Sequence, residues 1–354
     1  KKLEMKVLKQ VLGVDVSQKE LEVSLGRLNE DLSIELYSHR VFKNKETGFE
    51  ALYKWLEKNT IVEFPVRIVM EATGVYHQKF ACFIIEKGCN ISIVLPNKIS
   101  NYMRTLDTKT VTDKTCSEAI TRFGLERKLE DWNKPDDTYR SLQQLTRERD
   151  QIVNERTVCK NRLHAEESEA FPNEGSIRRI NELIKFLNKQ EQEIKQEIAI
   201  ILNENPAIKE QVKRISTIPG MGELTATIIL AETNGFELIR SKKQLTSYAG
   251  MDIKEKQSGT SVKGKPRLSK KGNRHIRKAM HLPSLSAVKY NPIHKDLYAR
   301  LVAKHGIKMK GLVAVQRKLL ELSFILWKNK INYNPEYEKE KRAVQNDKPS
   351  LKLA

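Results

Sequence analysis

Three short apolar segments separated by polar turns open the chain, and helical and apolar segments then alternate behind them. The three opening segments have the length and alternation of strands. The next segments read in turn as helix, buried strand, helix and strand. In chain order, these seven segments cover 11–17, 21–28, 33–42, 46–56, 67–73, 75–88 and 91–96. The order predicts an α/β domain with a mixed sheet, because meandering strands pair antiparallel and strands joined by helices pair parallel.

A three-stranded meander followed by alternating helix and strand is the order of a ribonuclease-H-like domain, whereas periodicity alone supports only an α/β domain with a mixed sheet. We therefore predict that residues 1–134 form such an α/β domain. Asp15 stands in the middle of the first apolar strand, where an ionised carboxylate is unfavourable unless something compensates it. Glu71 ends the buried strand over 67–73, directly before Ala-Thr-Gly, and Asp113 opens a helix.

Residues 135–210 read as almost entirely helical. Leu142, Leu145, Ile152 and Leu163 lie near heptad spacing, residues 171–175 interrupt the pattern, and isoleucines and leucines resume it from Ile177. This predicts a coiled-coil helical hairpin. Its apolar stripe packs either on a partner chain or on the chain's own domains, and the sequence leaves both open.

Residues 211–335 are predicted to form a mainly α C-terminal domain, followed by a flexible charged tail over 336–354. Its most informative stretch runs from a short helix through Pro219, Gly220, Met221 and Gly222 into a second helix. Glycines in such a turn present backbone N–H groups at a helix N-terminus, which favours phosphate. Gly220 and Gly222 thus form a candidate helix-hairpin-helix-like DNA contact. A plain helical corner is the alternative.

The positive charge is concentrated at the end of the chain. Residues 1–140 carry 23 basic and 21 acidic side chains, residues 141–210 carry 11 and 13, and residues 211–354 carry 30 and 11, so the net +19 comes from the last region. Within 254–278, ten Lys or Arg stand against Glu255 alone. Such a block favours nucleic acid, and its Gly, Ser and Pro residues predict a loop. We expect these nucleic-acid contacts: Lys263, Lys265, Arg267, Lys270, Lys271, Arg274, Arg277 and Lys278, the last residues on a helix starting near Lys271.

Several stretches resemble the recombinases of insertion-sequence family 110. VLGVDVSQKELEVSL, VMEATGVYH, VLPNKI and TDKTCSEAITRFG are similar to its N-terminal domain, and IPGMGELTATIILAE, LTSYAGM, KQSGTSVKGKPRLSKKGNRHIRKAM and LVAVQRKLL to its C-terminal transposase domain. The resemblance covers nearly the whole chain. It implies a RuvC-like domain, a coiled-coil insertion and a second domain with a nucleophilic serine. It further implies DNA recombination guided by a structured noncoding bridge RNA, in homodimers that pair into tetramers.

The resemblance assigns the acids one by one. The family's first-strand acid corresponds to Asp15, its Glu before Ala-Thr-Gly to Glu71, and the first acid of its TDxxDA helix start to Asp113. These three are the expected catalytic ligands of Mg²⁺, with Mn²⁺ as the alternative. The family's second helix acid falls on Cys116, and a thiol is a poor ligand for Mg²⁺. We expect a working three-acid site. A weakened, Mn²⁺-preferring or purely structural site stays open, and Asp107 could also swing in.

The resemblance also selects the serine. Ser258, Ser261 and Ser269 all lie in the basic block, and composition does not choose among them. The family's Ser-Gly pair falls on Ser258 and Gly259, so Ser258 is the expected nucleophile and Ser261 the second candidate. Ser269 is instead a candidate helix cap. Neighbouring cations would stabilise the charge that develops on phosphate during attack.

The expected function is therefore that of a DNA transposase or recombinase acting through a serine–phosphate intermediate. Its expected partners are double-stranded donor and target DNA, bridge RNA and further copies of the chain. A Holliday-junction-resolvase-like nuclease, a DNA invertase without RNA and a non-catalytic nucleic-acid-binding protein that has lost the fourth acid are the alternatives. No apolar run reaches the ~18–20 residues of a membrane span, and the four cysteines lack CxxC spacing. We expect a cytoplasmic protein.

Overall fold

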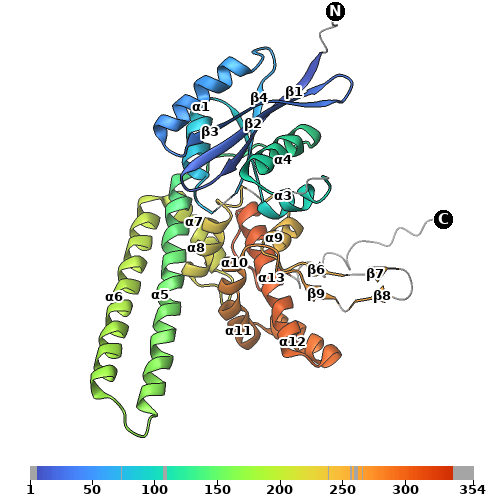
Figure 1. Ribbon diagram of the computed structural model, residues 1–354. Coiled ribbons are helices and arrows are strands. Elements are labelled where there is room, and N and C mark those ends of the chain that lie inside the picture. The colour runs from blue at the N-terminus through green and yellow to red at the C-terminus, as the bar shows by residue number, and fades with distance from the viewer. Residues whose placement is uncertain are drawn as a thin grey trace, which may run out of the picture. The chain divides into compact units, whose positions relative to one another are not determined.

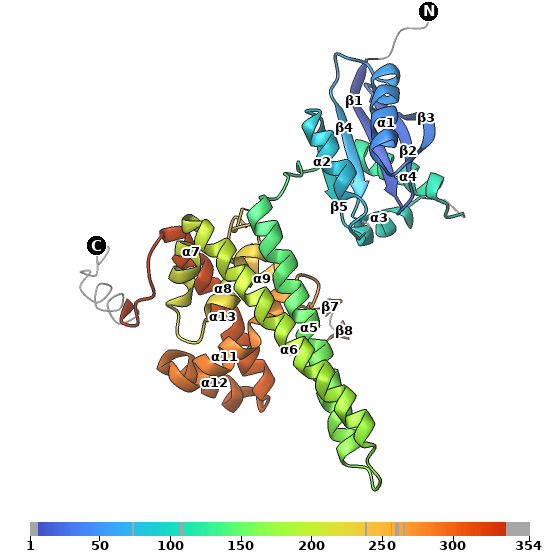
Figure 2. The ribbon, with the colours of Figure 1, turned by 90° about the vertical axis from the view of Figure 1, so that its left-hand side faces the viewer.

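The computed structural model describes residues 6–72, 74–106, 110–237, 239–255, 257–258, 262–264 and 266–337, with backbone alone for 257, 258, 262 and 263. Asp107, Ser261, Lys265 and the expected tail from residue 338 onward therefore lie outside the described residues. The chain divides into two compact units, residues 1–134 and 135–354. Figures 1 and 2 show the elements of each unit.

The first unit is built on a five-stranded mixed sheet. Its strands are β1 (Val7–Val16), β2 (Glu20–Asn29), β3 (Ile34–Lys43), β4 (Val66–Glu71) and β5 (Asn90–Val94). The spatial order is β3-β2-β1-β4-β5. The first three strands pair antiparallel, whereas β4 and β5 run parallel to β1. This is the strand order expected of a ribonuclease-H-like domain.

Helices cover both faces of that sheet. They are α1 (Glu46–Asn59), α2 (Gln78–Glu86), α3 (Pro96–Met103) and α4 (Asp113–Glu126). On one face, Phe49 and Leu52 of α1 and Phe80 of α2 share a core with the sheet. On the other face, Ile120 of α4 and Ile99 of α3 form a separate core, and Figure 2 shows α1 and α4 on opposite faces.

Helix α4 lies unusually close to the strand that carries Asp15. A Cβ added to Gly13 would stand 2.3 Å from Thr121 Oγ1 and 2.5 Å from the Ser117 carbonyl oxygen. Only glycine allows this approach. The Thr121 hydroxyl also donates to the Ser24 carbonyl at 2.9 Å, so polar contacts fix α4 across β1 and β2.

The second unit begins with the predicted helical hairpin. Its long helices are α5 (Asp137–Glu167) and α6 (Glu174–Glu204). Leu142 and Leu145 of α5 and Ile198 of α6 belong to the same core as the helices that follow, so there the stripe packs within the chain. Farther along, Phe186 is 55% exposed and Phe171 at the tip 95%.

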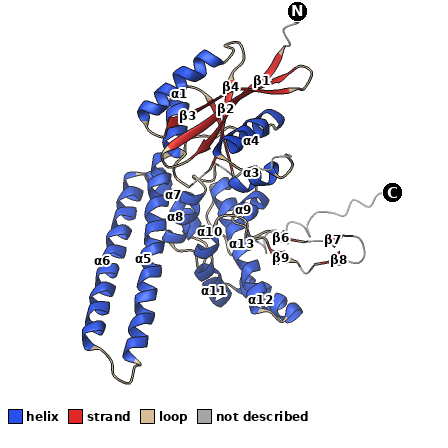
Figure 3. Cartoon of the chain, viewed as in Figure 1, coloured by secondary structure: helices blue, strands red, loops and turns tan. Residues whose placement is uncertain are grey.

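Among the described residues, the rest of the second unit consists of helices, loops and four two-residue strands, and Figure 3 shows the short strands in red. The helices are α7 (Pro206–Ser216), α8 (Glu223–Glu232), α9 (Lys242–Tyr248), α10 (Arg274–Ala279), α11 (His281–Tyr290), α12 (Pro292–His305) and α13 (Lys308–Asn329). The predicted turn joins α7 to α8. Gly220 there has φ +93°, and an added Cβ would stand 2.9 Å from the Pro283 carbonyl of α11, so this glycine has a packing role. Its predicted phosphate contact, and that of Gly222, stay predictions.

The predicted loop in the basic block was wrong in part, because several of its described residues pair as strands. The strands pair β6 (Ile253–Lys254) with β9 (Arg267–Leu268) and β7 (Gln257–Ser258) with β8 (Val262–Lys263), both antiparallel. We call the described residues between 253 and 268 the ribbon. Cross-strand hydrogen bonds outweigh the Gly, Ser and Pro content. The expected helix start was also wrong: Asn273 caps α10 through its side chain, so Lys270 and Lys271 precede the helix and Ser269 is not its cap.

Candidate functional site

The acids of the first unit are gathered by the sheet and by α4. Val14 pairs with Met70, so Asp15 and Glu71 are the next residues on neighbouring parallel strands. Asp113 stands in the first turn of α4, whose N-terminus is closed by a capping box between Thr112 and Thr115. At the other end, the Lys9 ammonium donates to the Arg127 carbonyl at 2.9 Å. Both ends of α4 are thus fixed.

These carboxyls interact electrostatically. Burial, followed by the negative charges of Asp113 and Glu71, raises the pKa of Asp15 to about 6. Burial also raises the pKa of Glu71. Neighbouring carboxylates repel one another, and a bound cation relieves this repulsion.

Cys116, also in the first turns of α4, interacts with the same three carboxyls. Burial, followed by the charges of Asp15 and Glu71, raises the pKa of its thiol to about 11. The thiol is therefore protonated at neutral pH and contributes no charge. Its sulfur lies 4.0 Å from the sulfur of Met103.

The donor set of Asp15, Glu71 and Asp113 fits a divalent cation by its chemistry, since it consists of hard carboxylate oxygens. Within the part of the chain that the structure describes, no three His, Cys, Asp or Glu side chains are close enough together to hold a metal ion. The assignment of these acids as ligands therefore remains a prediction.

A fourth carboxylate near Asp15 was not anticipated. Glu22 lies directly opposite Asp15 across the β1–β2 pair, so the two side chains share one face of the sheet. The Glu22 carboxylate is 2.9 Å from Nε2 of His39. The register of the first two strands could have indicated this pairing.

The ribbon places the predicted serine. Ser258 is the last residue of β7, and its backbone partner is Val262, the first residue of β8. Near the base of the ribbon Lys254 and Arg267 are both exposed. The cations are therefore distributed along a paired structure that ends near Ser258.

The predicted nucleic-acid contacts differ in their surroundings. The Arg277 guanidinium donates to the Ala249 carbonyl at 2.7 Å and to the Gly272 carbonyl at 3.0 Å. Lys278 pairs with Asp150 of α5 at 2.5 Å. These two side chains have intramolecular partners. Arg267, Lys270, Lys271 and Arg274 are exposed.

Glu232 is a buried charge that the sequence analysis did not single out. Its carboxylate is 0% exposed and accepts two hydrogen bonds from Arg147, at 2.7 and 2.8 Å. Burial acts to raise the pKa of Glu232, but hydrogen bonds from Arg147 and Asn273 hold it below its ordinary value. The available signal was a lone acid at the end of the apolar run from Ala226 to Ala231, the same kind of signal as at Asp15.

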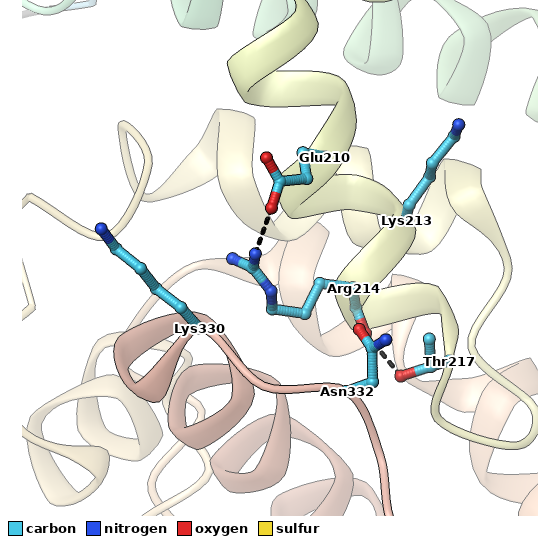
Figure 4. A pocket seen from close by; sticks show the side chains of 6 residues that line it. All are labelled: Glu210, Lys213, Arg214, Thr217, Lys330 and Asn332. Atoms are coloured by element: carbon cyan, nitrogen blue, oxygen red, sulfur yellow. Dashed lines mark hydrogen bonds and ion pairs between the residues drawn. The ribbon is translucent and has the colours of Figure 1, made fainter.

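A hollow of about 330 Å³ lies between the end of α7 and the end of α13 (Figure 4). Its acid, Glu210, is paired with Arg214. Lys213 and Lys330 point away from each other, so the cations do not converge on one point. The hollow is lined by Glu210, Lys213, Arg214, Thr217, Lys330 and Asn332.

Two family models match the chain. A model described as Transposase IS116/IS110/IS902 family matches residues 212–299, and a DEDD transposase model of IS110 elements matches residues 12–172. Between them they match parts of both units. No helix in the described residues is both long enough and apolar enough to cross a bilayer.

Curated relatives and solved structures give further likenesses. The chain is 26% identical to the pilin gene-inverting protein of Moraxella bovis, over 89% of this chain and 95% of that protein. It is 27% identical to an uncharacterised 43.6 kDa protein of insertion element IS110 from Streptomyces coelicolor, over 32% and 27%. The structure of T. thermophilus RuvC in complex with Holliday junction substrate matches at 9% identity and TM-score 0.27, over 35% and 99%. The strand order itself therefore carries the fold assignment.

Proposed function

Because the chain belongs to the IS116/IS110/IS902 family of transposases, we propose that it cuts and rejoins DNA through a covalent link between DNA and Ser258. The observation that supports this proposal is the β7–β8 pairing, in which Ser258, the last residue of β7, pairs with Val262 within the basic ribbon. A residue on such a ribbon can approach a phosphate that a flat surface cannot reach. A guiding bridge RNA and assembly of homodimers into tetramers are part of the same proposal.

The proposed step conserves atoms and bond energy. The Ser258 hydroxyl oxygen bonds to the phosphorus of a DNA phosphodiester, one bridging P–O bond breaks, and the hydroxyl proton ends on the departing DNA oxygen. The reverse attack by a DNA hydroxyl rejoins a strand and frees the serine, so no nucleotide cofactor is consumed. Lysines close to Ser258 in sequence, Lys256 and Lys263, would stabilise the charge that develops on the phosphate.

The carboxylates of Asp15, Glu71 and Asp113 would hold Mg²⁺ or Mn²⁺, which neutralises charge on a phosphodiester. Burial and, after it, repulsion from Asp113 and Glu71 raise the pKa of Asp15, and this repulsion supports a cation there. Cys116 adds a neutral thiol where the family has a fourth acid. The proposal is therefore a three-carboxylate site.

A denaturing gel with labelled DNA tests the serine. The wild-type protein should form a covalent protein–DNA adduct, and peptide mapping should place it on Ser258. Ser258→Ala should bind DNA normally and form no adduct, whereas Ser261→Ala should form it as the wild type does. An adduct mapped to Ser261 would move the assignment, and cleaved DNA without any adduct would favour water as nucleophile and a resolvase-like reaction.

Site-specific inversion is a second candidate, favoured by the likeness to the pilin gene-inverting protein over most of both chains. Sequencing the RNA that copurifies with the protein from its native genomic context separates the two. A defined noncoding RNA from DNA next to the gene supports guided recombination. Random RNA favours an invertase that recognises DNA by protein contacts.

A further inference from the structure

The backbone pairing of the ribbon continues below its strands into the helical body. The Ser269 amide donates to the Asp252 carbonyl at 2.8 Å, and the Lys270 amide donates to the Gly250 carbonyl at 3.0 Å. The Asn273 amide then donates to the Tyr248 carbonyl at 2.7 Å. We call residues 248–252 and 269–273 the ribbon base.

Two glycines allow the base to close. An added Cβ on Gly272 would stand 2.4 Å from the Tyr248 carbonyl oxygen and 2.5 Å from the Gly250 nitrogen. Gly250 has φ +66°, which favours glycine. The guanidinium of Arg277 bonds the Ala249 and Gly272 carbonyls, one on each strand of the base. The base is therefore tightly packed.

Asn273 connects this base to the buried carboxylate. Its side-chain amide donates to Glu232 Oε2 at 2.6 Å, while its side-chain oxygen accepts from the His275 and Ile276 amides and so caps α10. The Tyr248 hydroxyl donates to the backbone carbonyl of Glu232 at 2.8 Å. Both strands of the ribbon base thus contact Glu232.

The same carboxylate holds the long helix α5. Arg147 binds it through two parallel hydrogen bonds, and Gln143 donates to it at 3.3 Å. A bidentate Arg–carboxylate pair fixes orientation as well as distance. If the buried Glu232 carboxylate loses one hydrogen-bond partner, that partner is left unsatisfied. The bonds of Glu232 to α5 and its bonds to the ribbon base therefore depend on each other.

We propose that Glu232 is a positioning residue that joins the ribbon to α5, so that the tip of the ribbon is held in a fixed orientation to the helical hairpin. This rests on the proposed function only in assigning chemistry to the tip. Glu232 itself is fully buried and touches no DNA in this role. It acts through Asn273 on one side and through Arg147 on the other.

Hydrogen–deuterium exchange of the free protein tests the connection without any DNA chemistry. Glu232→Gln should speed exchange over residues 248–273 by about tenfold, because hydrogen bonds to a charged group are lost. Arg147→Lys should loosen the same residues, although Arg147 lies on another helix and its side chain bonds to Glu232 and not to the ribbon base. Asn273→Ser retains a capping side chain but is too short to reach Glu232, so it should loosen the ribbon base alone.

Glu191→Gln is the matched control. Glu191 of α6 is also a buried acid and is 5% exposed. It pairs with Arg149, Arg156 and Lys195 rather than with the ribbon base. Its replacement should speed exchange within α5 and α6 and leave residues 248–273 as in the wild type. Unchanged exchange of the ribbon base in Glu232→Gln, or equal loosening by Glu191→Gln, would overturn the proposal.

A second readout separates positioning from general stability. At saturating DNA, Glu232→Gln should form the Ser258 adduct at least about tenfold more slowly, while the dependence of DNA affinity on salt stays that of the wild type, since every exposed cation remains. If no adduct forms even in the wild type, the proposed function fails but the exchange result still decides the role of Glu232. A normal adduct rate together with a loosened base would exclude a positioning role.

Discussion

Lys254 lies directly opposite Arg267 in the antiparallel β6–β9 pair, and both side chains are exposed. Like charges at directly opposed positions destabilise a strand pair by roughly 0.2–1 kcal/mol. A bound polyanion removes this repulsion, so the pair is better suited to the complex with nucleic acid than to the free protein.

Replacing one member of this pair should change stability and binding in opposite directions. Arg267→Gln should slow hydrogen exchange of the ribbon in the free protein and weaken DNA binding. The slope of log affinity against log salt should become shallower by about one, as expected for one lost phosphate contact. Lys185→Gln, at an exposed lysine of α6, is the control and should change neither quantity. A wild-type slope in Arg267→Gln would exclude this phosphate contact.

The raised pKa of Asp15 predicts a gain of stability when its charge is removed. An acid whose pKa is higher in the folded state favours folding most fully below its unfolded pKa of about 3.8, and this contribution is lost as the pH rises through about 6. Asp15→Asn should therefore stabilise the cation-free protein at pH 7.5, by about 1 kcal/mol after allowance for solvent screening. The gain should shrink at pH 4.5.

Thermal unfolding at the two pH values, with and without Mn²⁺, measures this effect. Mn²⁺ should raise the Tm of the wild type and leave Asp15→Asn almost unchanged. Asp31 provides a control of opposite sign, because hydrogen bonds from Ser33 lower its pKa. Asp31→Asn should not raise the Tm at pH 7.5. A variant at Asp15 that is still stabilised by Mn²⁺ would separate this residue from the cation site.

Restoring an acid at position 116 should strengthen cation binding. The Cys116 thiol is neutral at pH 7 because its pKa is raised to about 11. Cys116→Asp should increase Mn²⁺ affinity by about tenfold or more, since it adds a hard oxygen ligand, and should lower the Tm without cation by adding a charge beside three carboxylates. Cys116→Ser, of similar size and without charge, should do neither. Titration of Mn²⁺ followed by electron paramagnetic resonance compares the three proteins.

The alternation of apolar and polar residues predicted the five strands and helices α1, α2 and α4 of the first unit, but not helix α3. Each strand of the sheet buries residues in a pattern that its sequence carries locally, so the order of strands and helices predicts the topology. The position of Asp15 in an apolar strand and of Glu71 at a strand end followed from the same pattern. The pairing of Asp15 with Glu22 did not, because it depends on the register between two strands.

The ribbon could not be predicted in the same way. Most of its residues are polar, charged or small, and Ile253, Val262 and Leu268 are too far apart in sequence to form an alternating apolar face. Its order comes from cross-strand hydrogen bonds, which continue in the base between residues as far apart as Tyr248 and Asn273. The role of Glu232 has the same origin, because its partners Arg147 and Asn273 are distant in sequence. Contacts between residues that are distant in sequence give only a weak signal in the local sequence, such as one acid at the end of an apolar helix.

Because α4 lies so close to β1, we expect a substitution of Gly13 both to destabilise the fold and to disrupt the acidic site. Gly13→Ala would place a Cβ 2.3 Å from Thr121 Oγ1 and 2.5 Å from two backbone atoms of α4, and backbone cannot move aside as a flexible side chain can. We expect a loss of about 3 kcal/mol in the free energy of unfolding, as for an overpacked core. Because the helix that carries Asp113 must shift away from the strand that carries Asp15, stabilisation by Mn²⁺ should also disappear. Urea unfolding with and without Mn²⁺ measures both effects.

Gly88→Ala is the matched control, since its Cβ would meet nothing within 4 Å and only the φ of +77° is strained. It should lose about 1 kcal/mol and keep its response to Mn²⁺. If Gly13→Ala keeps that response as well, the spacing between α4 and β1 does not control the acidic site.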